Sequence, residues 1–307
     1  MEKSAYKIHI IGAGVSGLIA AKVLENNGYS PTIIEASKTV GGRVKSDTVQ
    51  GYQLDHGFQV LLTSYPAAKK YLDLKGLALQ ELLPGATIFK NEKSQTIGDP
   101  LRNLSLLLPT LLASIGNFAD KLKILKLNRH LKKKSISAIF KTPETTTLTY
   151  LQKLGFSKAM LQDFFKPFFS GIFLEPNLNT SSRMFEFVYK MFGNGFAALP
   201  KAGMQAISNQ LKDGLKNTTI VLNSPVKEVK NKTVILQDGS EIESHFTIIA
   251  TEASHLVANL KNQETAWKSC DTLYFETSKR TLQRPIIGLI ADENALINNL
   301  FYPTSVA

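Results

Sequence analysis

Glycines near the N-terminus have the spacing of a turn that binds phosphate. Residues 12–17 read GAGVSG and directly follow a short apolar run that contains Ile8, Ile10 and Ile11. In such a G-x-G-x-x-G turn, the first glycine permits the tight bend and the second lets the backbone approach a pyrophosphate. The third lets the following helix pack on the sheet. The N-terminus of that helix offers unpaired N–H groups and a partial positive charge to phosphates. The pattern therefore predicts a dinucleotide-binding turn.

The elements around this turn are those that it requires. A helix of small residues is predicted from Ser16 to Asn27, and Gly28 follows where a left-handed cap is expected. The next strand, Thr32 to Ile34, ends on Glu35, whose carboxylate can accept hydrogen bonds from ribose hydroxyls. A glycine-rich helix start without a ligand is the alternative. The strand, helix and acid in this order favour a dinucleotide-binding βαβ unit.

Two further motifs distinguish the kind of dinucleotide. Gly41-Gly42-Arg43 lies just past the acid, and Asp55-His56-Gly57 follows further along. A nicotinamide site has no obvious need for the second glycine pair and the arginine. With these motifs the chain resembles the flavin-containing amine oxidase superfamily, which includes monoamine oxidases, protoporphyrinogen oxidases and phytoene desaturases. The resemblance implies FAD, with Glu35 on the adenosine ribose, Arg43 near the pyrophosphate and the backbone around Gly57 close to the isoalloxazine ring.

The resemblance also assigns residues in the second half of the chain. The valine after a Ser-Pro pair touches the adenine in this superfamily, and Val226 stands at that position. Pro200 to Met204 resembles a Pro-x-Gly-Gly-Met segment, with Ala202 in place of one glycine. The residues expected to bind the cofactor are Gly12, Ala13, Gly14, Val15, Ser16, Gly17, Glu35, Ala36, Gly41, Gly42, Arg43, Gly57, Phe58, Val226, Ala250 and Thr251. No catalytic acid or base can be assigned, no metal site is indicated, and His56 is interpreted as a locally hydrogen-bonded histidine.

The predicted fold class is α/β. We expect a two-dinucleotide-binding-type FAD domain, with a Rossmann-like βαβ unit and a β-meander crossover over 225–246, formed by residues 1–64 and 200–262. An inserted α+β substrate domain takes residues 65–199 and 263–307. Strands are expected at 272–277 and 286–290, and a helix is expected to begin at Thr251. The Gly-Asp motif and last strand of the superfamily are not found, so the chain is interpreted as a C-terminally truncated reading frame with an open sheet edge at 247–250.

Net charge and composition indicate which kinds of partner the protein could bind. The 307-residue chain has 36 Lys and Arg against 25 Asp and Glu, a net charge of +11. Such a balance suits nucleic acid, an anionic membrane or an acidic ligand, and no nucleic-acid module is recognised, so a membrane is favoured. Lys121 to Lys134 interleaves leucines with lysines, which is typical of a helix lying on an anionic membrane or of an ordinary solvated helix. The longest apolar stretch, Leu104 to Ile115, contains Pro109 and is too short to span a bilayer. A single cysteine, Cys270, favours a reducing cytoplasm. The basic charge adds the expectation of peripheral contact at the inner membrane surface.

The predicted activity is FAD-dependent oxidation, with a hydride equivalent passing from an apolar or amine small molecule to the flavin. If the 307-residue chain is truncated, it is itself expected to be inactive. Aromatic residues are dense over 164–196, and they form either the domain core or the wall of an apolar cavity. A polyamine would favour an acidic cavity, and this chain is poor in acids. Two alternatives remain open. An NAD-dependent dehydrogenase would lack flavin absorbance, and a non-catalytic lipid- or prenyl-binding protein of GDP-dissociation-inhibitor-like architecture would bind lipid without flavin.

Overall fold

The computed structural model describes residues 2–260 and 265–306, and the chain divides into two compact units. Unit 1 comprises Met1–Gln59, Lys69–Ala78 and Pro200–Trp267. Unit 2 comprises Val60–Ala68, Leu79–Leu199 and Lys268–Ala307. The predicted domain boundary between residues 262 and 263 lies outside the described residues.

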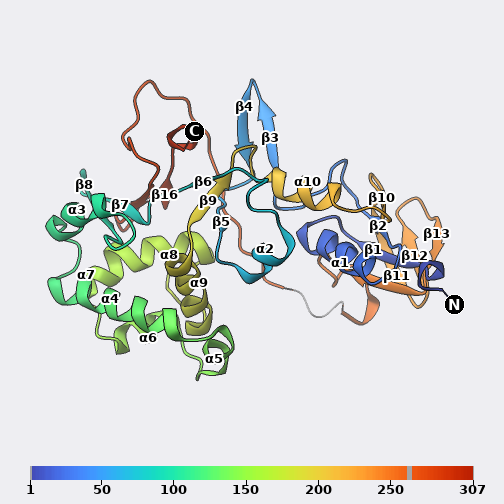
Figure 1. Cartoon of the computed structure of the whole chain (residues 1–307), viewed down its shortest axis with the longest axis horizontal. Coiled ribbons are helices and arrows are strands. Elements are labelled where there is room, and N and C mark those ends of the chain that lie inside the picture. The colour runs from blue at the N-terminus through green and yellow to red at the C-terminus, as the bar shows by residue number, and fades with distance from the viewer. Residues whose placement is uncertain (1, 261–264, 307) are drawn as a thin grey trace. The chain divides into compact units, whose positions relative to one another are not determined.

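Unit 1 contains a parallel sheet with the strand order β10-β2-β1-β14, of which β10, β2 and β1 are labelled in Figure 1. Its strands are β1 (Ile8–Ile11), β2 (Thr32–Ile34), β10 (Thr219–Val221) and β14 (Phe246–Ile249). All four residues of β1 are buried, as expected for a central strand of a parallel sheet that is covered on both faces. Helix α1 (Val15–Asn26) connects β1 to β2 and contacts α10 (Gln205–Asp213). The predicted α/β class and the βαβ unit are confirmed.

The predicted β-meander is present in unit 1. It consists of β11 (Val226–Lys230), β12 (Thr233–Leu236) and β13 (Glu241–Glu243), paired antiparallel. Val234 of β12 is fully buried against Ile11 and Ile34, so the meander packs on the parallel sheet. The unit also contains the hairpin of β3 (Ser46–Val49) with β4 (Tyr52–Asp55) and the short helix α2 (Pro66–Tyr71), of which Lys69–Tyr71 belong to this unit.

Two predicted elements are wrong. Residues 251–257 form no helix, because the Glu252 carboxylate accepts a hydrogen bond from the Ser254 backbone N–H (2.9 Å) and stabilises a local turn instead. Residues 272–277 form no strand, and their side chains, including Leu273 and Phe275, are exposed. A strand needs a neighbour for its backbone groups. Among the described residues β14 is an edge strand of the parallel sheet, as predicted.

Unit 2 combines two small sheets with a layer of helices. One sheet has the order β16-β15-β7-β8, with β15 parallel to β7, and the other has the order β5-β9-β6. The strands are β5 (Leu61–Leu62), β6 (Leu79–Glu81), β7 (Gly85–Lys90), β8 (Lys93–Gly98), β9 (Ala197–Pro200), β15 (Ile287–Ile290) and β16 (Asn299–Leu300). The helices are α3 (Leu107–Leu112), α4 (Phe118–Lys133), α5 (Ile136–Lys141), α6 (Thr147–Lys153), α7 (Lys158–Met160), α8 (Lys166–Phe173) and α9 (Ser182–Asn194). A π-helical turn over Leu161–Phe165 joins α7 to α8.

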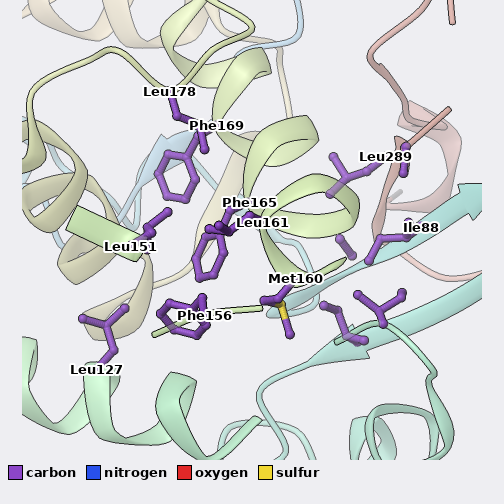
Figure 2. Packing of buried hydrophobic residues seen from close by; sticks show 14 of the residues in the cluster. Ile88, Leu127, Leu151, Phe156, Met160, Leu161, Phe165, Phe169, Leu178 and Leu289 are labelled. Carbon is purple, nitrogen blue, oxygen red and sulfur yellow. The ribbon is translucent and has the colours of Figure 1, made fainter. Parts of the chain in front are cut away.

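Aromatic residues form the core of unit 2. Figure 2 shows Phe156, Phe165 and Phe169 packed among leucines from several helices, with Ile88 and Leu289 reaching in from β7 and β15. Phe165, Phe169 and Phe185 are fully buried. These rings therefore belong to the domain core. The partly buried aromatic residues that pack against it include Phe164, Phe168, Phe173, Phe187, Tyr189 and Phe192.

Helix α4 shows why its sequence pattern is amphipathic. Leu127 and Leu131 are buried in the core of unit 2, and Ile124 packs against it. These three residues of the predicted apolar face of a membrane-bound helix are thus used for core packing. Over residues 2–260 and 265–306, no helix combines the length and apolar character needed to cross a bilayer.

A buried carboxylate fixes the start of α4. Asp120 accepts hydrogen bonds from the backbone N–H groups of Asn117 and Ser157 (both 2.9 Å) and from the Ser157 hydroxyl (2.5 Å). Burial by itself raises the pKa of the Asp120 carboxyl, but the hydrogen bonds outweigh it and hold the pKa below its usual value. The ionised carboxylate therefore stabilises the fold above the unfolded pKa, and this contribution disappears as the pH falls through the lower folded pKa.

We expect Asp120→Ala to lower the free energy of unfolding by about 2–4 kcal/mol at pH 7, because three donors lose a charged acceptor. The difference from wild type should shrink below about pH 4, where the carboxyl becomes protonated in the unfolded chain while it is still ionised in the folded protein, and should vanish once the folded form is protonated as well. Urea unfolding at pH 7, 5 and 3 measures both effects. Asp213→Ala, at an exposed position, is the control. A constant difference at all three pH values would contradict the assignment of the ionised form.

Candidate cofactor site

The glycine turn between β1 and α1 has the geometry that its sequence predicts. Gly12 has φ +103°, and a Cβ there would lie 3.3 Å from the Ala250 carbonyl oxygen. A Cβ on Gly17 would lie 2.0 Å from the Gly12 carbonyl oxygen, so only glycine allows this close packing. A Cβ on Gly14 would meet nothing within 4 Å, which leaves open space beside the N-terminus of α1. Val15 and Ser16 form the first turn of that helix.

The second glycine pair lies against the first. The Gly41 backbone N–H donates to the Ala13 carbonyl oxygen (2.9 Å), and Gly14 and Gly41 form an isolated parallel bridge. Gly42 has φ +58°, and a Cβ there would approach Gly14 Cα to 3.4 Å. The two glycine motifs, separate in sequence, thus lie side by side next to the open space at Gly14.

Glu35 lies at the same end of the sheet. Its Oε2 accepts the Ala13 backbone N–H (2.6 Å), and its Oε1 accepts the backbone N–H and hydroxyl of Ser37 (2.8 and 2.7 Å). Each carboxylate oxygen has two lone pairs, so the group can still accept a ribose hydroxyl. The Glu35 carbonyl oxygen accepts the Ser224 N–H (2.9 Å), which brings the segment leading to Val226 beside it. Ala36 is exposed next to Glu35.

The end of β14 completes this edge. The Ala250 N–H donates to the Ile11 carbonyl oxygen (2.8 Å), and the Thr251 Cβ would lie 3.4 Å from a Cβ on Gly12. Ala250 and Thr251 therefore flank the glycine turn at the carboxyl ends of parallel strands, where ligands bind in open α/β sheets.

Arg43 is exposed, and its guanidinium lies 5.3 Å above the centre of the Trp267 ring. This is a cation–π arrangement, which holds the side chain while leaving its N–H groups at the rim. The Gln59 side-chain amide donates to the carbonyl oxygens of Arg43 (3.0 Å) and His56 (3.1 Å). It connects the arginine loop with the loop of Gly57 and Phe58, in which Gly57 has φ +97° and both residues are half-buried.

His56 forms a local pair, in agreement with its interpretation from the sequence. Its Nε2 lies 2.6 Å from the Asp47 Oδ2 on the neighbouring strand β3. The hydrogen bond from His56 lowers the pKa of the Asp47 carboxyl, with a smaller contribution from the nearby positive charges. The imidazole is therefore engaged in the β3–β4 hairpin.

The hydrogen bonds of Met204 and Gln205 that position the site were not predicted. The Gln205 backbone N–H donates to the Ser46 hydroxyl (3.0 Å), and the Met204 N–H donates to Asp55 Oδ1 (2.9 Å). The Gln205 side chain donates to the Val40 carbonyl oxygen (2.9 Å), just before the second glycine pair. The signal was the Pro200–Met204 segment, but a sequence pattern cannot show that its partners lie in the β3–β4 hairpin.

This arrangement fits FAD. The open space at Gly14, the N–H groups of the first turn of α1 and the Glu35 carboxylate match a pyrophosphate followed by an adenosine ribose. Residues 15–280 match the model of the family described as flavin containing amine oxidoreductase.

The chain belongs to this family.

Similar proteins agree with this membership. The chain is 27% identical over 262 residues to an L-amino-acid oxidase of Bothrops pauloensis, covering 79% of this chain and 51% of the relative. It is 28% identical over 174 residues to protoporphyrinogen oxidase 2, chloroplastic/mitochondrial, of Arabidopsis thaliana, covering 55% of this chain and 32% of the relative. The chain thus spans about half or less of the length of these curated relatives.

Solved structures share the fold. A crystal structure of a Pyrococcus furiosus protein has a TM-score of 0.66 at 16% identity and covers 98% of this chain and 75% of that one. Cyclohexylamine oxidase of Brevibacterium oxydans has a TM-score of 0.57 at 18% identity and covers 82% and 60%. FAD is accordingly the cofactor that the flavin-containing family and the glycine turn together indicate.

Arg43→Ala should weaken FAD binding about tenfold or more, because a charge-assisted hydrogen bond contributes about 1.5–3 kcal/mol. Titration of the apoprotein with FAD, followed by flavin fluorescence, measures the effect. Arg43→Lys keeps the positive charge but loses the forked donor geometry of the guanidinium. Its affinity for FAD should therefore lie between those of the wild type and Arg43→Ala. If Arg43 served only to stack on Trp267, both variants would keep wild-type affinity.

Proposed function

We propose that this protein is an FAD-dependent oxidoreductase that accepts a hydride equivalent from a C–H or N–H bond next to an activating group of a small molecule. The observation that carries the proposal is that Gly14, with open space beside it, lies next to Gly42 and to the Glu35 carboxylate on Ala13 at the carboxyl ends of β1 and β2. Bound flavin supplies the redox chemistry, and the protein supplies binding, orientation and electrostatics.

The chain's own residues hold and orient the cofactor. The backbone N–H groups at the start of α1 would bind the pyrophosphate, and Arg43 would neutralise part of its charge at the rim. Glu35 would hold the adenosine ribose, with the backbone of Val226 toward the adenine. The loop of Gly57 and Phe58, tied to Arg43 by Gln59, would then lie toward the flavin ring.

The substrate class is an apolar or amine small molecule, with the apolar one favoured. The chain has 25 acidic residues against 36 basic ones, whereas a polyamine would be held by acidic groups. A curated relative is a protoporphyrinogen oxidase and another is an L-amino-acid oxidase, which supports both the apolar and the amine reading.

Cofactor analysis tests the proposal. The purified protein is denatured, and the released cofactor is separated by chromatography. FAD is expected, because the turn and Glu35 address a pyrophosphate and an adenosine; FMN or NAD alone would overturn the proposal. Dithionite reduction followed by reoxidation with oxygen then shows whether the bound flavin is redox-active. Lipid binding without any flavin would instead support the non-catalytic alternative.

We also propose that the segment from Lys121 to Lys134 contacts an anionic membrane surface, on the cytoplasmic side of the inner membrane. The basic residues of α4 that are exposed are Lys126, Arg129, Lys132 and Lys133. Lys134 is instead half-buried and forms an ion pair with the buried Glu186 (2.5 Å). Binding to vesicles should therefore depend on the four exposed cations and weaken as salt screens them.

A further inference from the structure

Helix α3 and the turn before it expose most of their leucine side chains, which a helix that packs on a domain core would bury. Its sequence, with the turn before it, is rich in leucine, yet Leu104, Leu108 and Leu112 are 81%, 65% and 75% exposed. Residues spaced by four lie on one face of a helix, so these leucines form a single outward face, which Leu107 and Leu111 widen. Exposed apolar groups gathered in this way mark an interaction surface.

The start of α4 continues this face. Phe118 is 67% exposed and Leu122 is 51% exposed, one turn apart on the same side of the helix. Lys121 Nζ donates to the carbonyl oxygens of Leu111 (3.2 Å) and Ala113 (2.7 Å), which fixes the end of α3 against the first turn of α4. We call the exposed side chains of Leu104, Leu107, Leu108, Leu111, Leu112, Phe118 and Leu122 the leucine face.

The rest of the exposed side of α4 is basic. Continuing from Phe118 and Leu122 at helical spacing, the exposed positions are Lys126, Arg129 and Lys133. One stripe of α4 is therefore apolar where it adjoins α3 and cationic further along. Figure 1 shows α3 beside the β7–β8 hairpin of unit 2, with α4 following it in the chain.

We propose that the leucine face inserts into the surface of an anionic lipid bilayer, with Lys126, Arg129 and Lys133 on the lipid phosphates beside it. The proposal deepens the membrane contact proposed above and rests on it. An apolar face next to a cationic stripe has the arrangement of an interfacial membrane anchor, in which the apolar groups enter the acyl boundary and the cations remain among the headgroups. A second protein chain would have no such need for cations along one side of the apolar face.

Vesicle flotation with matched variants tests the proposal. Wild-type protein is mixed with vesicles of phosphatidylcholine containing phosphatidylglycerol, at low salt and at high salt. We expect Leu104→Ser/Leu108→Ser/Leu112→Ser to lower the partition coefficient at least about tenfold at both salt concentrations. Lys126→Gln/Arg129→Gln/Lys133→Gln should lower the partition coefficient mainly at low salt, because at high salt these charges are already screened in the wild type.

Matched controls remove equal numbers of exposed groups elsewhere. Leu273→Ser/Phe275→Ser/Leu296→Ser replaces three strongly exposed apolar side chains of unit 2, and Lys69→Gln/Lys216→Gln/Lys227→Gln replaces three exposed lysines of unit 1. Both should bind within about twofold of wild type. Because all of these positions are exposed, the variants should keep the wild-type circular dichroism and flavin content, so a loss of binding is separate from a loss of the cofactor site.

Insertion is measured directly with a fluorescent label. The only cysteine, Cys270, is replaced in Cys270→Ser, and Leu108→Cys is then labelled with an environment-sensitive dye. We expect brighter, blue-shifted emission on the vesicles and quenching by nitroxide lipid, with no change for the label at Leu296→Cys.

If the leucine variant binds as wild type while the lysine variant does not, the membrane contact stands and insertion is overturned. If neither variant changes binding but the leucine variant alters the sedimentation of the free protein, the leucine face is a contact between copies and the proposal fails.

Discussion

Gly14→Val should abolish FAD binding in a protein that still folds. Gly14 has φ −69° and ψ 175°, a conformation open to any L-residue, and its Cβ would meet no protein atom within 4 Å. The valine methyl groups would instead fill the space through which a pyrophosphate approaches the start of α1. We expect the affinity for FAD to fall at least about 100-fold, equivalent to about 2.7 kcal/mol. Bound flavin per chain and a fluorescence titration measure this loss, and a thermal melt of the apoprotein checks the fold.

Two other glycines make the comparison specific. Gly17→Val should disrupt both fold and cofactor binding, because its Cβ would lie 2.0 Å from the Gly12 carbonyl oxygen. Gly193, near the end of α9 in unit 2, has open space like Gly14, so Gly193→Val should keep both. Gly14→Val protein that purifies with a full complement of FAD would show that the open space is not the pyrophosphate site.

The contrast among these glycines shows what the sequence could predict. The glycine turn, α1 and Glu35 are neighbours along the chain, so their spacing alone determines how they lie, and the structure agrees with the predicted βαβ unit. The meander was equally predictable, because short strands separated by tight turns pair with their sequence neighbours.

Features that depend on distant partners could not be predicted. Ser46 and Asp55 accept hydrogen bonds from the start of α10, more than a hundred residues away, and nothing in the local sequence indicates these contacts. The same limit applies to α4, whose amphipathic pattern is the same whether its leucines face a core or a lipid surface. Only the structure shows that Leu127 and Leu131 are buried while Phe118 and Leu122 are exposed. The predicted strand at 272–277 was wrong for the same reason, because the β propensity of a segment does not supply a strand for it to pair with.

Phe165→Ala should destabilise unit 2 by about 3–5 kcal/mol, the range for removing a fully buried aromatic side chain. Phe165 has no exposed surface, and its ring centre lies 4.8 Å from that of Phe156 and 5.2 Å from that of Phe164. The sequence left open whether these aromatics form a core or line a substrate cavity. The structure places Phe165 in the core, and the substitution tests this placement, because removing a core ring leaves an empty cavity that the neighbours fill only in part.

Urea unfolding followed by circular dichroism measures the change, with the slope against urea concentration expected to stay constant. Phe275→Ala removes an aromatic ring of unit 2 that is 83% exposed and should shift the free energy of unfolding by no more than about 0.5 kcal/mol. Phe164→Ala, at a partly buried position against the same core, should fall between them. If Phe165 lined an open cavity, its replacement would enlarge that cavity and leave the unfolding midpoint close to that of Phe275→Ala. A midpoint well below both wild type and Phe275→Ala would place Phe165 in the core, and the search for substrate contacts would then move to the half-buried rings around it.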